Sequence, residues 1–250
     1  MKIALYSALF LLIIAIPTIS SPYCASSTFG YVYSSLLGKE DASPYYHKLV
    51  VQALKAYGVK KAEKVLIKKM NGIGPALAGI DKDQLLSFTA FGIWLNEELL
   101  NHEDEAIRIM IIYHEAAHYV QKHHQQIVAS LATLSLITAA IFTASSYVSP
   151  QRWAQMATAA AWTGATWWGF DKFIFTPLVL SQEETADLEA TRVLVADGKQ
   201  KIVQQFMKHL KQQVDSGNGT NATDRWHETI AKQLESIKTY YEQLTARKQS

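Results

Sequence analysis

The chain has 250 residues, of which 49% are hydrophobic and 18% are charged, so it can bury a sizeable core and is not a disordered protein. Its 24 Lys and Arg residues balance 22 Asp and Glu residues, and this even charge argues against nucleic acid as a partner. The single cysteine, Cys24, excludes an intramolecular disulfide framework and a cysteine-based metal site. Any metal must therefore be bound by histidine and carboxylate side chains.

The first twenty residues have the pattern of an export signal. Lys2 precedes an apolar run over residues 3–19, and small polar residues follow at Ser20 and Ser21. This pattern predicts that residues 1–20 are a signal peptide, with an uncleaved signal anchor as the alternative. Residues 21–250 are then expected to form a single domain in the cell envelope.

The first part of this domain has the periodicity of one helix followed by two strands. Apolar residues recur every three or four positions over residues 43–57, which predicts a helix that Gly58 ends. Residues 64–70 and 86–95 have the composition of strands, and a turn rich in Gly and Pro separates them. We expect the second strand to lie at the edge of a small sheet.

A longer amphipathic helix is predicted next. Asn101 is a favourable N-cap, and Glu103, Asp104 and Glu105 then lie in the first turn, where the helix dipole favours anions. The apolar face of this helix continues to residue 121 and includes two histidines.

Two apolar stretches follow this helix. Residues 127–148 are 22 residues without a charge, about 33 Å of helix at a rise of 1.5 Å per residue, which is enough to cross a bilayer. Residues 154–170 add 17 uncharged residues. The two stretches predict a helical hairpin, inserted over residues 127–180, that spans a membrane. Because both are rich in Ala, Ser and Thr, a pair of buried core helices is the alternative. Further helices are expected over residues 181–197, 199–214 and 224–246.

His114, Glu115 and His118 form an H-E-x-x-H motif in the middle of the amphipathic helix. Histidines four residues apart lie on one face of a helix, at the separation that a tetrahedral zinc ion requires. Glu115 is then placed to accept a proton from a metal-bound water and to pass it to a leaving amine. The motif predicts a hydrolytic zinc site; a hydrogen-bonded face of an ordinary helix is the alternative.

A catalytic zinc site usually has three protein ligands, so a third ligand is expected. The carboxylate of Glu183 could reach the metal from a later helix, and Asp187, one turn further on, could orient a ligand histidine through its other ring nitrogen. Glu184 and Glu189 are competing carboxylates. An acidic helix N-terminus that only interacts with the helix dipole is the remaining alternative.

In this order, the motifs resemble those of the membrane-associated gluzincin metallopeptidases, a family that includes HtpX, the CAAX prenyl endopeptidases and the mitochondrial Oma-type proteases. The similar features are a strand before the helix, H-E-x-x-H with a further histidine, His123, five residues on, and membrane or amphipathic helices. Ser181-Gln182 and an E-x-x-A-D motif at residues 183–187 then follow.

The resemblance implies a zincin-like α+β fold that is mostly helical, with a small sheet and with the hairpin inserted between the two ligand-bearing helices. It implies that His114, His118 and Glu183 hold one zinc ion and that Asp187 supports a ligand from outside the coordination sphere.

The family also carries a C-terminal H-P-x-x-x-x-R-[IL] segment whose histidine stabilises the oxyanion of the tetrahedral intermediate. His227 begins a segment of similar spacing and is a candidate for this catalytic role. The segment lacks the proline and has Gln233 in place of the arginine. An exposed surface histidine is the alternative.

These features favour a zinc endopeptidase that acts on membrane-associated or misfolded envelope proteins. Its polypeptide substrate would lie extended along the strand at residues 91–95. Arg152 lies in the link between the two apolar stretches, and the positive-inside rule then places the catalytic domain outside the cytoplasm. The alternatives are a non-catalytic zinc-fold protein that binds or escorts membrane proteins, and a helical membrane protein whose motif is accidental.

Overall fold

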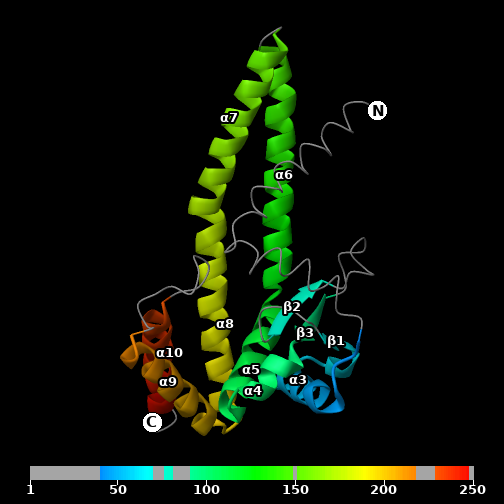
Figure 1. Ribbon diagram of the computed structural model, residues 1–250. Helices are drawn as coiled ribbons and strands as arrows, with labels where there is room; N and C mark the ends of the chain where they lie inside the picture. The colour runs from blue at the N-terminus through cyan, green and yellow to red at the C-terminus, as the bar shows by residue number, and fades with distance from the viewer. Residues whose placement is uncertain (1–39, 70–75, 81–90, 149–150, 218–228, 248–250) are drawn as a thin grey trace.

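The computed structural model describes residues 40–69, 76–80, 91–148, 151–217 and 229–247. Helices dominate these residues and one small sheet packs against them, which confirms the predicted, mostly helical α+β class (Figure 1). The helices are α3 (Pro44–Ala56), α4 (Glu97–His102), α5 (Glu105–Gln121), α6 (His123–Val148), α7 (Arg152–Phe170), α8 (Thr176–Ala196), α9 (Gln200–Asp215) and α10 (Ile230–Arg247). The strands are β1 (Leu66–Lys69), β2 (Ala76–Ile80) and β3 (Phe91–Leu95). The predicted signal segment, residues 1–20, lies outside the described residues.

The described strands form one sheet in the order β1-β3-β2. β1 runs parallel to β3, with Ile67 opposite Ile93, whereas β2 runs antiparallel to β3, with Ala78 opposite Ile93. The sequence does not predict β2, because Ala-Leu-Ala-Gly-Ile is poor in β-branched and aromatic residues. The expectation that residues 91–95 form an edge strand is wrong, because β3 is paired on both sides and β2 takes an outer position.

One face of the sheet supplies part of the hydrophobic core. Ile93 and Leu95 of β3 are fully buried in one cluster with Val50 and Leu54 of α3 and with Met110 of α5. Each such aliphatic side chain contributes about 1.5–3 kcal/mol relative to its exposed state. This cluster packs α5, the helix of the H-E-x-x-H motif, against the sheet and α3.

The chain enters α5 through a separate short helix, so the predicted N-cap at Asn101 is wrong. α4 begins after Asn96, whose side-chain oxygen accepts a hydrogen bond from the Leu99 amide at 3.2 Å. The extended backbone of Glu103 ends α4, and α5 begins after Asp104. The predicted amphipathic helix therefore begins later, at Glu105, and the sequence does not predict α4.

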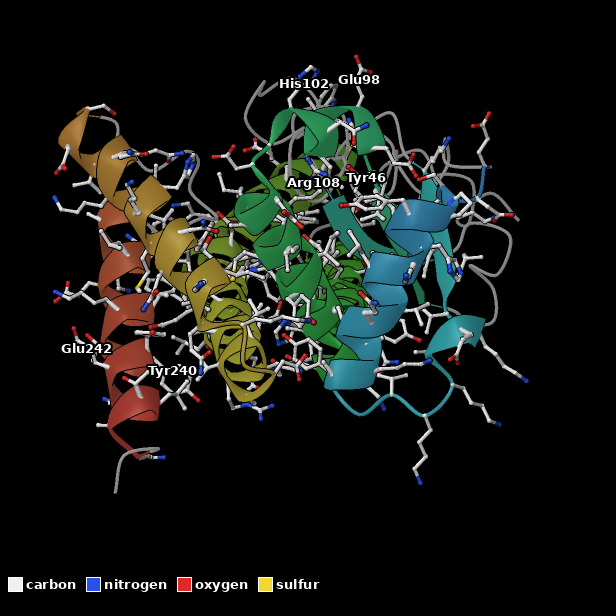
Figure 2. All side chains as sticks on the ribbon, turned by 90° about the horizontal axis from the view of Figure 1, so that it is seen from below. Tyr46, Glu98, His102, Arg108, Tyr240 and Glu242 are labelled. Atoms are coloured by element: carbon white, nitrogen blue, oxygen red, sulfur yellow. The ribbon has the colours of Figure 1, made fainter. Side chains whose placement is uncertain are left out.

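Arg108 and Tyr46 hold the break between α4 and α5 in place, and Figure 2 shows both side chains from below the molecule. The Arg108 guanidinium donates from Nε to the Leu100 carbonyl and from Nη2 to the Glu103 carbonyl, both at 2.9 Å. The Tyr46 hydroxyl donates to Oδ1 of Asn101 at 2.7 Å. The Arg108 bonds satisfy carbonyls at the end of α4 and fix the direction in which α5 starts, and the Tyr46 bond ties α3 to α4.

α6 and α7 pack against each other as a helical hairpin that projects away from the rest of the fold (Figure 1). The buried seam between them is narrow and includes Leu134 and Thr138 of α6 and Ala159 and Thr163 of α7. Only 12% of the stretch Gln125–Ser145 is buried. The predicted hairpin is confirmed, and the alternative of two buried core helices is wrong, because most of its surface contacts no other part of the described chain.

α7 continues into α8 through a π-helical turn, η3 (Asp171–Phe175). α8 therefore begins at Thr176 and not at residue 181 as predicted. The hairpin and the acidic residues 183–187 belong to one long helical rod, which crosses α5 at the foot of the hairpin (Figure 1).

Gly92 of β3 lies opposite Leu66 of β1, and this contact yields a stability prediction. A Cβ added there would lie 2.8 Å from the backbone oxygen of Leu66, which cannot move without disturbing the strand ladder. We expect Gly92→Ala to lower the free energy of unfolding by about 1–3 kcal/mol, measured by urea unfolding. Gly164→Ala is the matched control, because a Cβ added in α7 meets nothing within 4 Å. Equal destabilisation of the two variants would contradict the steric account.

Candidate metal centre

Small residues allow α5 and α8 to pack closely where the two helices cross. Ala117 shares a helical face with the histidines of α5, and Ala186 and Ala190 share a face with the acidic residues of α8; all three alanines are fully buried. Because no bulky side chain separates the backbones at these positions, polar side chains of the two helices can reach one another.

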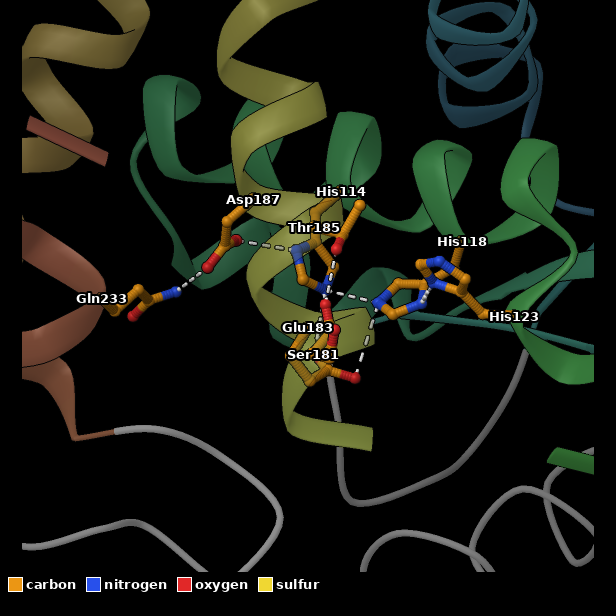
Figure 3. A network of polar contacts seen from close by, with 8 residues as sticks. All are labelled: His114, His118, His123, Ser181, Glu183, Thr185, Asp187 and Gln233. Atoms are coloured by element: carbon orange, nitrogen blue, oxygen red, sulfur yellow. Dashed lines mark hydrogen bonds and ion pairs between the residues drawn. The ribbon is translucent and has the colours of Figure 1, made fainter. Parts of the chain in front are cut away.

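Three side chains from these helices converge at this crossing, as Figure 3 shows. His114 Nε2 lies 2.9 Å from His118 Nε2 and 3.2 Å from one carboxylate oxygen of Glu183. The other oxygen of Glu183 lies 3.5 Å from His118 Nε2. Ligand atoms around a tetrahedral zinc ion lie about 3.3–3.5 Å apart, given bonds of about 2.0–2.2 Å. The three side chains are therefore spaced to hold one zinc ion.

The second ring nitrogen of His114 is also held. Its Nδ1 lies 2.8 Å from Oδ1 of Asp187, which is 7% exposed. An ionised carboxylate only accepts, so His114 donates through Nδ1–H and its Nε2 faces Glu183 and His118. The other oxygen of Asp187 accepts a hydrogen bond from Gln233 Nε2 at 2.8 Å.

His123 holds His118 in the same way. The two Nδ1 atoms lie 2.8 Å apart, and both rings are buried. Burial, assisted by the neighbouring His118, lowers the pKa of His123 to about 4, so the His123 ring is neutral near pH 7 and can accept the Nδ1–H of His118. A left-handed Lys122, with φ of 58°, ends α5 and turns the chain so that His123 lies against His118. The sequence places His123 in the motif but does not indicate this contact.

The carboxylates change the proton affinity of the metal-free cluster. Burial by itself lowers the pKa of His114, but the negative charges of Asp187 and Glu183 outweigh it and hold this pKa well above 6.5. Burial by itself raises the pKa of Glu183, but His118 and His114 outweigh it and hold this pKa well below 4.5. The metal-free cluster therefore keeps a proton on His114 that a metal ion must displace.

The competing carboxylates on α8 have other partners. Glu184 accepts a hydrogen bond from the Ser236 hydroxyl at 3.2 Å, and Glu189 pairs with Arg192 at 2.7 Å on the surface. Glu183 lies two turns inside α8, which begins at Thr176, so the alternative of an acidic helix N-terminus is wrong. Among the candidates for the third ligand, the structure brings Glu183 to the histidines.

Of the two predicted catalytic residues, the structure describes Glu115 and does not describe His227. Glu115 lies on α5 next to His114 and is 9% exposed, which places it in the interior beside the cluster but not among its three members. His227 lies outside the described residues.

The sequence around this site matches a known protein family. The family model of peptidase family M48 matches residues 54–237, a span that contains the three-stranded sheet, both helices of the cluster and the hairpin. The chain belongs to peptidase family M48. M48 peptidases are zinc metalloproteases, so this chain is a hydrolase whose cofactor is zinc, and the geometry of its His-His-Glu cluster suits one such ion. No match is found among curated proteins or among solved structures.

The shifted pKa values of this M48 site predict opposite pH dependences without and with zinc. The raised pKa of His114 stabilises the metal-free fold below pH 6.5, and this stabilisation is lost as the pH rises through the folded-state pKa. The lowered pKa of Glu183 stabilises the fold above pH 4.5, and this stabilisation is lost as the pH falls through the folded-state pKa. The cluster should therefore contribute most to the melting temperature of the metal-free protein between pH 4.5 and 6.5.

Zinc requires a neutral His114, so the increase in melting temperature on adding zinc should grow as the pH is raised from about 6 to about 8. Thermal unfolding of the metal-free and zinc-loaded protein across this range measures both effects. The His114→Phe/Glu183→Gln variant serves as the control and should show neither dependence. A zinc-induced shift that does not change with pH would contradict the assignment of the proton to His114.

Proposed function

We propose that this M48 metallopeptidase is an endopeptidase of the cell envelope that hydrolyses membrane-associated or misfolded envelope proteins. The observation that carries this proposal is the position of the His-His-Glu cluster at the foot of an exposed apolar hairpin. The apolar stretch Gln125–Ser145 begins only seven positions after His118 along the chain. A substrate held at a membrane surface would thus be close to the site.

The residues have distinct roles in the proposed reaction. His114, His118 and Glu183 hold the zinc ion, and Asp187 and His123 orient the two imidazoles. Zinc, when bound, polarises the scissile carbonyl and makes water acidic enough to react near neutral pH. Glu115 takes up the proton of the attacking water and returns it to the departing amine. Its burial keeps bulk water from competing for that proton.

The substrate is proposed to extend along β2. Among the described strands, β2 is the outer one that packs against α5, whereas β3 has both edges paired. An outer strand offers backbone N–H and C=O groups that pair with any extended polypeptide, which gives affinity without strict sequence demand. This mode of binding suits an enzyme that acts on misfolded proteins.

The surface of the hairpin supports insertion into a bilayer. Side chains with large apolar surfaces project outward, including Leu136 at 72% exposure and Trp162 at 62%. The hydroxyls of Thr133, Ser135 and Thr143 face outward, and each donates to the carbonyl four residues earlier, so none of them needs water. One described helix, α6, contains a stretch long and apolar enough to cross a membrane, whereas α7 does not meet this criterion on its own.

Aromatic residues lie at both ends of the hairpin. Tyr147 and Trp153 are 85% and 84% exposed on either side of the link between α6 and α7. At the other end, Trp168 and Phe173 are exposed, and Lys172 lies 5.0 Å from the centre of the Trp168 ring and 5.7 Å from that of Phe173. Tryptophan, tyrosine and lysine favour the two interfaces of a bilayer. Trp153 and Phe173 are 20 positions apart, about 30 Å of helix at a rise of 1.5 Å per residue, which is close to the thickness of a bilayer's hydrocarbon core.

A hairpin that crosses twice returns both ligand-bearing helices to the same side of the membrane. Arg152, the first residue of α7 after the link, favours placement of the tip in the cytoplasm and of the metal centre outside it. We accordingly propose residues 21–250 as a single extracytoplasmic metallopeptidase domain with the hairpin inserted over residues 127–180. The segment 1–20 would direct export.

The role of Glu115 is tested by an isosteric change. Glu115→Gln should keep one equivalent of zinc and lose about 10²–10⁴-fold in kcat/KM, because the amide cannot accept the proton. Zinc content is measured by elemental analysis, and activity with an unfolded fluorogenic protein substrate.

His114→Ala and Glu183→Ala should lose both zinc and activity, whereas Glu189→Gln, a carboxylate on the surface of α8, should keep both. Retained proteolysis in Glu115→Gln would overturn the mechanism. A zinc-loaded wild type without turnover on unfolded or membrane-anchored substrates would favour a binding or escort protein.

The membrane assignment is tested at Leu136, near the middle of the apolar stretch. Leu136→Lys places a charge where it costs about 2.5–3.5 kcal/mol in a bilayer, so we expect the protein to leave the membrane fraction. Flotation with lipid vesicles measures this. Leu99→Lys on α4 is the control, because Leu99 is an exposed apolar residue, 38% exposed, outside the hairpin. Unchanged flotation of Leu136→Lys would contradict insertion.

A further inference from the structure

Two side-chain hydrogen bonds join α10 to α8. Gln233 Nε2 donates to Oδ2 of Asp187 at 2.8 Å, and the Ser236 hydroxyl donates to Oε1 of Glu184 at 3.2 Å. The donors are three residues apart on α10 and the acceptors three apart on α8, in reversed order, so the two bonds lie along one antiparallel contact. Only the first of them ends on a residue that contacts the metal cluster.

Asp187 uses its two oxygens on opposite sides (Figure 3). Oδ1 accepts from His114 Nδ1 at 2.8 Å and Oδ2 accepts from Gln233 at 2.8 Å. With Asp187 only 7% exposed, water cannot readily replace either partner. If Gln233 did not donate, the carboxylate could rotate about its Cβ–Cγ bond and Oδ1 would no longer be fixed opposite the imidazole.

We propose that Gln233 is a positioning residue that orients His114 towards zinc by fixing the rotamer of Asp187. The inference rests on the ligand set proposed above. Gln233 is a neutral amide. The amide holds the carboxylate without adding a positive charge, so the full negative charge of Asp187 acts on His114.

The experiment measures zinc release from the purified full-length protein to an excess of a chromogenic chelator. Partners that support metal ligands from outside the coordination sphere typically contribute 10–100-fold in affinity. We expect release about 10-fold faster in Gln233→Leu, which removes the donor. In Gln233→Glu, a second carboxylate faces Asp187 and release should be faster still.

The double variant Asp187→Asn/Gln233→Glu separates orientation from simple loss of a contact. In this variant the amide nitrogen at position 187 can donate to the carboxylate at position 233, and the amide oxygen at position 187 can still accept from His114. Both hydrogen bonds are then present, with the donor and acceptor of the bond between positions 187 and 233 exchanged. We expect the double variant to release zinc more slowly than either single variant. Single-variant effects that simply add would overturn the proposal.

Ser236→Ala is the matched control, because it breaks the other bond between the same two helices. Visible absorption of the cobalt-substituted protein, which reports ligand geometry, should change in Gln233→Leu and not in Ser236→Ala. Equal acceleration of zinc release in these two variants would show that Gln233 only docks α10, and wild-type release in Gln233→Leu would likewise overturn its positioning role.

The outcomes also separate this inference from the proposed ligand set. Zinc binding by the wild type that is lost in His114→Ala supports the ligand set, whatever the Gln233 variants show. Zinc absent from the wild type, or retained in His114→Ala, would overturn both proposals.

Discussion

The close packing of α5 against α8 is the contact on which the metal centre depends. His114 and Glu183 are 69 positions apart in the sequence, and small residues such as Ala117 and Ala186 let their helices approach. α5 is itself fixed by the sheet, by α3 and by the hydrogen bonds of Arg108 at its start. The hydrophobic core thus determines the distances within the polar cluster, because the ligands extend from helices that the core has already placed.

Hydrogen bonds around the cluster determine how its imidazoles are turned. His114 and His118 each have one ring nitrogen in the cluster and the other held by a buried partner, Asp187 for His114 and His123 for His118. The two partners differ in charge. Asp187 supplies a negative charge that raises the pKa of His114, whereas burial keeps His123 neutral. Metal binding and protonation therefore compete at His114.

The helical rod formed by α7, η3 and α8 connects the metal centre with the apolar hairpin. Glu183 is part of this rod. His118 lies in the last turn of α5, and only Lys122 separates α5 from α6. Both helices of the cluster thus meet the hairpin at its foot. The same geometry that forms the cluster also fixes its distance from the exposed group of Trp168, Lys172 and Phe173.

Local patterns in the sequence determined the H-E-x-x-H pair, most of the helices and the lengths of the apolar stretches, because helical spacing and burial periodicity act over a few residues. They were weakest for short segments. β2 is a strand because β3 pairs with it, and the short helix α4, which the periodicity does not predict, ends at Glu103 close to the predicted start of the longer helix. Tertiary structure alone decided between Glu183 and its neighbours, since only the crossing of α5 and α8 fixes which carboxylate faces the histidines. It also brought Gln233 to Asp187 from a helix 46 positions further along the chain, a contact that no local spacing encodes.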